Sequence, residues 1–79
     1  DYTSKGRIDL TILYDDKAYV MEFKVIESEG AEPKAIKQLR EKRYFEKYKE
    51  RAKEIYLIGI DFSETQRNIQ NFEFERVQI

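Results

Sequence analysis

Two carboxylates and one ammonium group in the first third of the chain could cooperate chemically: Asp9, Glu22 and Lys24. Carboxylates held close together can bind a hard divalent cation such as Mg²⁺, whose preferred ligands are oxygens. Glu22 and Lys24 are two positions apart, so both side chains lie on one face if this segment is a strand. Whether Asp9 lies beside them depends on the elements that carry the three residues.

These elements read as a β-hairpin. Segments 7–14 and 17–26 are rich in β-branched and aromatic residues, which favour strands. Asp15 and Asp16 separate them and are typical of a tight turn, because aspartate tolerates turn conformations and can bond its own backbone. We therefore expect an antiparallel pair joined by a two-residue loop.

A two-residue loop fixes the register of the hairpin and brings the carboxylates together. It places Asp9 opposite Glu22 and Arg7 opposite Lys24, with all four on one face. We expect the opposite face to form the core. On the second strand that face consists of Tyr19, Met21, Phe23 and Val25.

Facing carboxylates need an explanation, because like charges with Cβ atoms about 5 Å apart destabilise a bare sheet. A bound divalent cation, a protonated carboxyl, or pairing with Arg7 and Lys24 could each offset the repulsion. The spacing alone favours the third, a solvated and salt-bridged hairpin face. Two features favour a functional site. The charges interrupt an otherwise apolar face, and a salt-bridged surface has no need of Gly6-Arg7 just ahead of the Asp. The apolar members of that face are Ala18, Val20 and Ile26.

Composition excludes several other kinds of chemistry. The 79 residues include no Cys and no His, which removes disulfide scaffolds, thiol catalysis, cysteine zinc sites and histidine-based catalysis. Lys and Arg number 15, Asp and Glu 16, so any nucleic-acid binding requires a local patch. Hydrophobic residues make up 41%, too many for a disordered segment. With no membrane-length apolar run and no signal peptide, we expect a cytoplasmic protein without a membrane partner.

The rest of the chain predicts one helix and two more strands. Pro33 suits the first helical position, where its missing N–H costs nothing, and the helix is expected to run to about Arg51. Segment 55–61 is nearly all apolar, like a strand covered on both faces, and segment 71–78 alternates as a last strand. The helix stripe expected to face the sheet consists of Ala35, Gln38, Leu39, Phe45, Tyr48 and Ala52.

The order ββαββ predicts an α/β domain with a mixed sheet. The strand–helix–strand unit implies a right-handed crossover between parallel strands 17–26 and 55–61, whereas the outer strands are antiparallel to their neighbours. One helix cannot cover both faces of a sheet. A further helix missing from this fragment, or a partner chain, would cover the second face, so we expect self-association as a homodimer.

Four motifs resemble the PD-(D/E)XK nuclease superfamily: GRID at 6–9, MEFK at 21–24, QLREKRY at 38–44 and IYLIGI at 55–60. The resemblance is closest to the branch found after AAA-ATPase-like domains in bacterial proteins. It implies a restriction-endonuclease-like fold that lacks the family's N-terminal helix and first strand. Residues 1–79 are therefore expected to be a single truncated domain cut from a longer bacterial protein.

The resemblance also implies roles for the matching residues. Asp9 and Glu22 would hold Mg²⁺, or Mn²⁺, together with the backbone carbonyl of Phe23. Lys24 would orient or help deprotonate the attacking water and stabilise charge on the phosphate. Gln38 would reach from the helix to hold Lys24 or the phosphodiester. The implied activity is Mg²⁺-dependent hydrolysis of DNA.

Departures from the family pattern leave other functions open. Many relatives carry a Tyr one helical turn after the Gln, where this chain has Lys42, and Tyr44 lies beyond it.

Arg7 and Tyr44 would support the site. The implied partners are DNA and an ATPase-like domain in the same chain. The alternatives are a catalytically silent interaction or dimerisation module and a nucleic-acid binder that cleaves nothing.

Two pairs of aromatic residues are expected to pack rather than to bind. Tyr44 and Tyr48 could stack on nucleobases, but packing on the sheet or on another domain is the simpler expectation. Phe72 and Phe74 are expected in the core on one face of the last strand.

Overall fold

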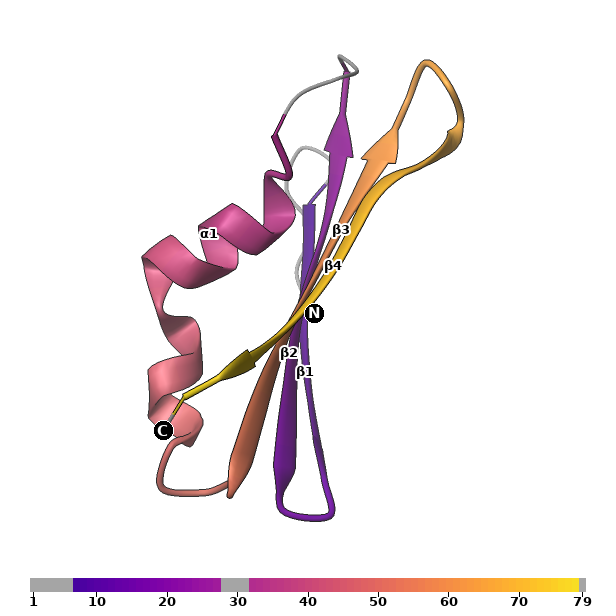
Figure 1. The fold of residues 1–79 in the computed structure, drawn as a ribbon. Helices are drawn as coiled ribbons and strands as arrows, with labels where there is room; N and C mark the ends of the chain where they lie inside the picture. Colours follow the sequence, from indigo (N-terminus) through magenta and orange to yellow (C-terminus); the bar gives the residue numbers. More distant parts are fainter. Residues whose placement is uncertain (1–6, 28–31, 79) are drawn as a thin grey trace.

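The structure is a four-stranded sheet with helical segments on one side (Figure 1). It is a computed structural model that describes residues 7–27 and 32–78. The strand order is β1-β2-β3-β4. The elements are β1 (Arg7–Tyr14), β2 (Lys17–Ile26), α1 (Ala35–Lys42), the 3₁₀ helix η1 (Tyr44–Tyr48), β3 (Glu54–Ser63) and β4 (Asn68–Val77).

The strand directions confirm the predicted mixed sheet. β1 and β2 are antiparallel, β2 and β3 are parallel, and β3 and β4 are antiparallel. The hairpin has the predicted bounds because Asp15 and Asp16 both adopt the left-handed conformation, with φ of 54° and 63°, that a two-residue turn requires. Its register is therefore the predicted one, with Asp9 opposite Glu22.

The last two strands extend further than predicted. Pairing continues past a bulge at Asp61 and Phe62 as far as Ser63, which pairs with Asn68. A short turn closes this hairpin, because the N–H of Arg67 donates to the Ser63 carbonyl over 2.8 Å. Most of the segment between the predicted strands 55–61 and 71–78 is thus strand as well.

The prediction of one helix to Arg51 was wrong. α1 ends at Lys42, and Arg43 adopts a left-handed conformation with φ of 55°, its N–H donating to the Leu39 carbonyl. This conformation costs about 1–2 kcal/mol for a residue other than glycine. The turn carries Phe45 into the core, and burying such a side chain contributes about 1.5–3 kcal/mol. None of the described helices is long and apolar enough to cross a membrane.

The hydrophobic core lies on the opposite face from the one predicted. Residues Tyr19, Met21, Phe23 and Val25 are half-buried on the open face. The alternation along β2 makes both faces apolar, so the direction of the crossover, rather than hydrophobicity, decides which face α1 covers. The core cluster consists of Ala18, Val20, Ile36, Leu39, Phe45, Ile55 and Leu57.

Gly59 in β3 allows α1 to lie directly on the sheet. A Cβ atom at this position would lie 2.4 Å from the backbone nitrogen of Ile36 and 2.7 Å from its Cα. No side chain fits there without displacing the helix backbone. The glycine therefore fixes how closely α1 approaches β3.

The open face of the sheet is aromatic, and no described element covers it (Figure 1). Tyr19 stacks on Tyr56 with ring centroids 5.4 Å apart, and Phe74 meets Tyr56 edge-on at 5.2 Å. Phe72 and Phe74 are 59% and 56% exposed, so the prediction that they form core was wrong. They lie on an edge strand of the face that the helix does not reach.

Candidate functional site

The two carboxylates of the hairpin lie on the covered face of the sheet. Asp9 on β1 is the direct partner of Glu22 on β2. Glu22 is 1% exposed, and both residues place a carboxylate oxygen (Oδ1 and Oε1, respectively) out of contact with solvent. Glu22 therefore does not lie on a solvated, salt-bridged face of the hairpin. Burying a carboxylate carries a large desolvation cost, so its position needs a specific cause.

Gln38 connects Glu22 to Lys24 from the middle of α1. With its amide nitrogen facing the carboxylate, Nε2 donates to Oε2 of Glu22 over 2.6 Å. In the same orientation Oε1 accepts from Nζ of Lys24 over 3.1 Å. In the reversed amide, the oxygen would face the carboxylate acceptor and the nitrogen would face the ammonium donor. Sequence reasoning placed Gln38 near Lys24, and the structure adds the bond to Glu22.

Asp61 sets the position of the helix that carries Gln38. This carboxylate is 1% exposed, and its two oxygens accept hydrogen bonds from the N–H groups of Lys34, at 2.7 Å, and Ala35, at 2.9 Å. The side chain of Asn71 donates to it as well, over 3.0 Å. An acid at this end of α1 satisfies amides that have no partner within the helix and complements the helix dipole.

This role of Asp61 was not predicted from the sequence, in which Asp61 was expected to be the last residue of a strand. One signal was available: a single acid interrupts the apolar run of β3, whose pairing continues beyond it. Asp61 is also the register partner of Lys24 on β2. The capping residue and the ammonium group therefore belong to the same end of the sheet.

The remaining predicted site residues are Arg7, Phe23 and Tyr44. Arg7 is the register partner of Lys24, and its side chain lies outside what the structure describes. The Phe23 ring stacks on Phe62 on the open face, at 6.1 Å, so its backbone alone could serve the site. Tyr44 follows α1 and is 51% exposed, so the sheet does not bury it as one expectation had it, and packing on another domain stays a prediction.

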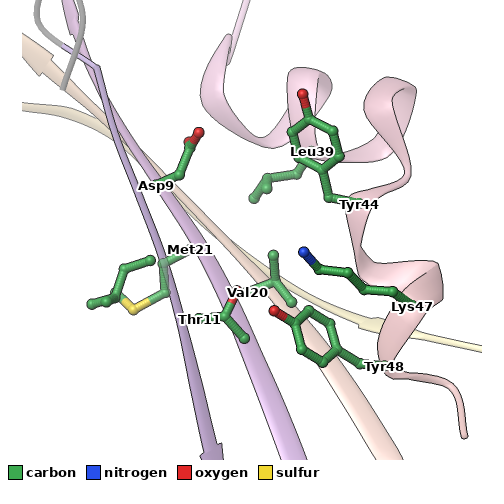
Figure 2. A pocket seen from close by; sticks show the side chains of 9 residues that line it. Asp9, Thr11, Val20, Met21, Leu39, Tyr44, Lys47 and Tyr48 are labelled. Atoms are coloured by element: carbon green, nitrogen blue, oxygen red, sulfur yellow. The ribbon is translucent and has the colours of Figure 1, made fainter. Parts of the chain in front are cut away.

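A cavity of about 420 Å³ lies beside Asp9, between the hairpin and η1 (Figure 2). Its Lys47 ammonium and Tyr48 hydroxyl point into the space (Figure 2). Tyr48 is half-buried and also packs against the core, as expected. Neither this cavity nor a role for Thr11 was predicted from the sequence. The polar residues lining the cavity are Asp9, Thr11, Tyr44, Lys47 and Tyr48.

The donor groups at the carboxylate pair suit a hard divalent cation. Asp9 and Glu22 supply oxygen ligands from neighbouring strands, and the chain contains neither His nor Cys. Within residues 7–27 and 32–78, no group of three or more acidic ligands forms. Two protein carboxylates are nevertheless enough for Mg²⁺, which typically keeps several of its waters.

Comparison with known proteins identifies the family of the chain. The sequence model of the PD-(D/E)XK nuclease superfamily, whose members generally use divalent metals, matches residues 1–72. An uncharacterized protein from the vnfD 5′ region of Azotobacter chroococcum mcd 1 is 43% identical over 75 residues. That match covers 95% of this chain but 14% of the relative. No solved structure matches significantly. With its mixed sheet and helix of the restriction-endonuclease-like α/β type, the chain belongs to the PD-(D/E)XK nuclease superfamily.

Proposed function

We propose that this chain is a metal-dependent phosphodiesterase domain that hydrolyses DNA. The observation that carries the proposal is the direct pairing of Asp9 with the buried Glu22, beside a lysine that shares its hydrogen-bonding partner. A hairpin selected for stability alone would gain more from apolar residues at these positions, because buried charges are costly.

Each residue would have a distinct role. Asp9 and Glu22 would hold Mg²⁺ or Mn²⁺ with the carbonyl of Phe23; the bound ion would polarise the phosphate and lower the pKa of its bound water. Gln38 keeps the Glu22 carboxylate and the Lys24 ammonium in fixed orientations. The Lys24 ammonium would orient the attacking water and stabilise the charge that develops on the phosphate oxygens.

The domain would act within a longer protein. The chain spans 14% of the relative it matches, so most of that protein lies outside this domain. Following the motifs at 38–44 and 55–60, the proposed context is a cytoplasmic bacterial protein with an AAA-ATPase-like domain in the same chain.

The test compares Glu22→Gln with Asp15→Asn, a control in the exposed turn of the same hairpin. We expect Mg²⁺ or Mn²⁺ to support DNA cleavage by the wild-type protein and by the control. Gln38→Ala should slow cleavage roughly 10- to 100-fold, as for residues that orient a metal ligand, and Glu22→Gln should slow it further. Cleavage that persists in Glu22→Gln would reject the assignment.

Metal binding provides a second measurement that does not depend on activity. A ligand that binds the native state raises the temperature of unfolding, so Mg²⁺ should stabilise the wild type and not Glu22→Gln. Equal melting temperatures with and without Mg²⁺ or Mn²⁺ in the wild type would remove the metal site from the proposal.

The open face supports a second candidate function, that of an interaction module without catalysis. Phe72 and Phe74 are more than half exposed beside other aromatic residues of the same face. Such a surface favours a protein partner, and the partner proposed is a second copy of this chain, giving a homodimer. Self-association without metal-dependent cleavage would favour this candidate over the first.

A further inference from the structure

The cavity beside Asp9 has the size of a small-ligand site. Its volume is about 420 Å³, and ligand cavities in proteins typically start near 300 Å³. Asp9 belongs both to the cavity wall and to the carboxylate pair with Glu22. A group that fills the cavity therefore lies next to the bond that the proposed site would cleave.

The walls of the cavity suit a flat, apolar ring. Val20 and Leu39 line it and are almost fully buried, at 4% and 3% exposed. Tyr44 and Tyr48 bring aromatic rings from either end of η1 (Figure 2). Tyr44 as a residue is 51% exposed, so it remains accessible to a ligand. Aromatic residues of this kind bind nucleobases by stacking, independently of base identity.

Lys47 adds a positive charge to the same cavity. Its ammonium lies 5.4 Å from the centre of the Tyr48 ring and points into the space (Figure 2). The neighbouring acid Glu46 pairs with Arg43 and Lys49 instead, at 2.5 and 4.0 Å. A cation next to aromatic rings matches the two parts of a nucleotide, its phosphate and its base.

The composition of the walls also indicates which form of nucleic acid fits. In a duplex, neighbouring bases cover the ring faces, and the grooves expose base edges alone. Apolar walls and an Asp9 carboxylate would disfavour a phosphate backbone by itself. We propose that the cavity binds one unpaired nucleotide next to the scissile phosphate, so that the substrate is single-stranded DNA or a duplex end that carries unpaired nucleotides. This inference rests on the proposed function.

The experiment measures the affinity of the protein for a short fluorescent DNA oligonucleotide, single-stranded or annealed as a blunt duplex. Ca²⁺ replaces Mg²⁺ to prevent cleavage, and fluorescence anisotropy reports binding. The variants are Tyr44→Leu and Lys47→Gln, both at exposed positions, and the control is Lys49→Gln in the turn after η1. Circular dichroism checks that all three remain folded.

We expect the wild type and Lys49→Gln to bind the single strand more tightly than the duplex. Tyr44→Leu should weaken single-strand binding roughly 5- to 100-fold, the range for losing a base–aromatic stack. Lys47→Gln should also weaken it and should reduce the slope of log affinity against log salt by about 0.7, as for one lost phosphate contact.

Two outcomes separate this inference from the proposed function. If the wild type binds both forms equally, or if neither variant weakens single-strand binding, the nucleotide site is rejected even where Glu22→Gln abolishes cleavage. If both variants weaken single-strand binding while Glu22→Gln still cleaves, the nucleotide site is supported and the catalytic assignment is rejected.

Discussion

The two faces of the sheet differ in a way that hydrophobicity alone would not predict. The face under α1 and η1 contains the core, yet it also buries Glu22, Asp61 and Ser63 to 1% exposure or less. The open face is richer in large apolar side chains, and several of them remain more than 40% exposed. Apolar area thus does not decide which face the helix covers, and the covered face instead contains the small residue Gly59 and buried hydrogen-bonding groups.

The buried charges of the covered face are connected to α1. Asp61 accepts hydrogen bonds from the first turn of the helix, and Glu22 accepts one from Gln38 in its middle. On the open face, by contrast, aromatic rings such as those of Tyr19 and Tyr56 pack on one another. Two carboxylates therefore lie at the contact between helix and sheet, where their orientation is most restricted.

The largest expected effect comes from adding a side chain under the helix. Gly59→Leu should destabilise the fold by about 3 kcal/mol or more, because its Cβ alone would meet the Ile36 backbone at 2.4 Å. Ile58→Ala, the neighbouring position on the open face, should cost less because that side chain is only half-buried. Urea denaturation measures both. Equal losses would mean that close approach of the helix at Gly59 is not required.

The hairpin shows how much of this arrangement the sequence predicts. Asp15-Asp16 is a strong turn signal, and a two-residue turn leaves one register, so the pairing of Asp9 with Glu22 followed directly. The parallel direction of β2 and β3 followed from the strand–helix–strand order, which implies a crossover connection. Gln38 was placed near Lys24 by the resemblance of its motif to the nuclease superfamily, not by the geometry of the predicted helix.

Other features depend on contacts that have no local signal. The break at Arg43 uses a left-handed conformation that usually indicates glycine, so the sequence predicted an uninterrupted helix. Both faces of β2 alternate with apolar residues, which left the side of the core undetermined and led to the wrong assignment. Asp61 binds the start of α1, which lies far from it in the sequence. Lys47 likewise lines a cavity together with residues of the distant strand β1.

A moderate effect is expected from removing the cap of α1. Asp61→Ala should destabilise the fold by about 1–2 kcal/mol, as for other helix N-terminal caps, and free the amides of Lys34 and Ala35. Hydrogen exchange at these two amides should accelerate more than at the amides of β1. If their exchange is unchanged, Asp61 does not hold the helix.

A smaller effect on stability, but a clear one on assembly, is expected at the open face. Phe74 is 56% exposed and meets the Tyr56 ring edge-on, so Phe74→Ser should change the stability of the monomer by about 1 kcal/mol or less. Light scattering should show a dimer for the wild type at micromolar concentration and a monomer for the variant. A wild type that is monomeric throughout this range contradicts the proposed homodimer, in which a second copy of the chain covers the open face.

The smallest expected effect is a pH dependence at the edge of the open face. The Tyr56 hydroxyl donates to Oε1 of Glu54, which lowers the pKa of Glu54 below its ordinary 4.5. A depressed pKa adds stability above pH 4.5, and this contribution is lost as the pH falls through the lower value in the folded state. Tyr56→Phe should therefore be less stable than the wild type near neutral pH and converge with it in acid.

Tyr19→Phe is the matched control for this change, since Tyr19 stacks on Tyr56 in the same aromatic cluster. It should leave the pKa of Glu54, followed by NMR, unchanged. Because Glu54 and Tyr56 are both partly exposed, solvent screens their interaction, and the pH effect stays small. Convergence in acid would show that the difference between Tyr56→Phe and the wild type arises from an ionised Glu54. If the stability difference persists at all pH values, it arises from packing of the ring and not from the interaction of Tyr56 with Glu54.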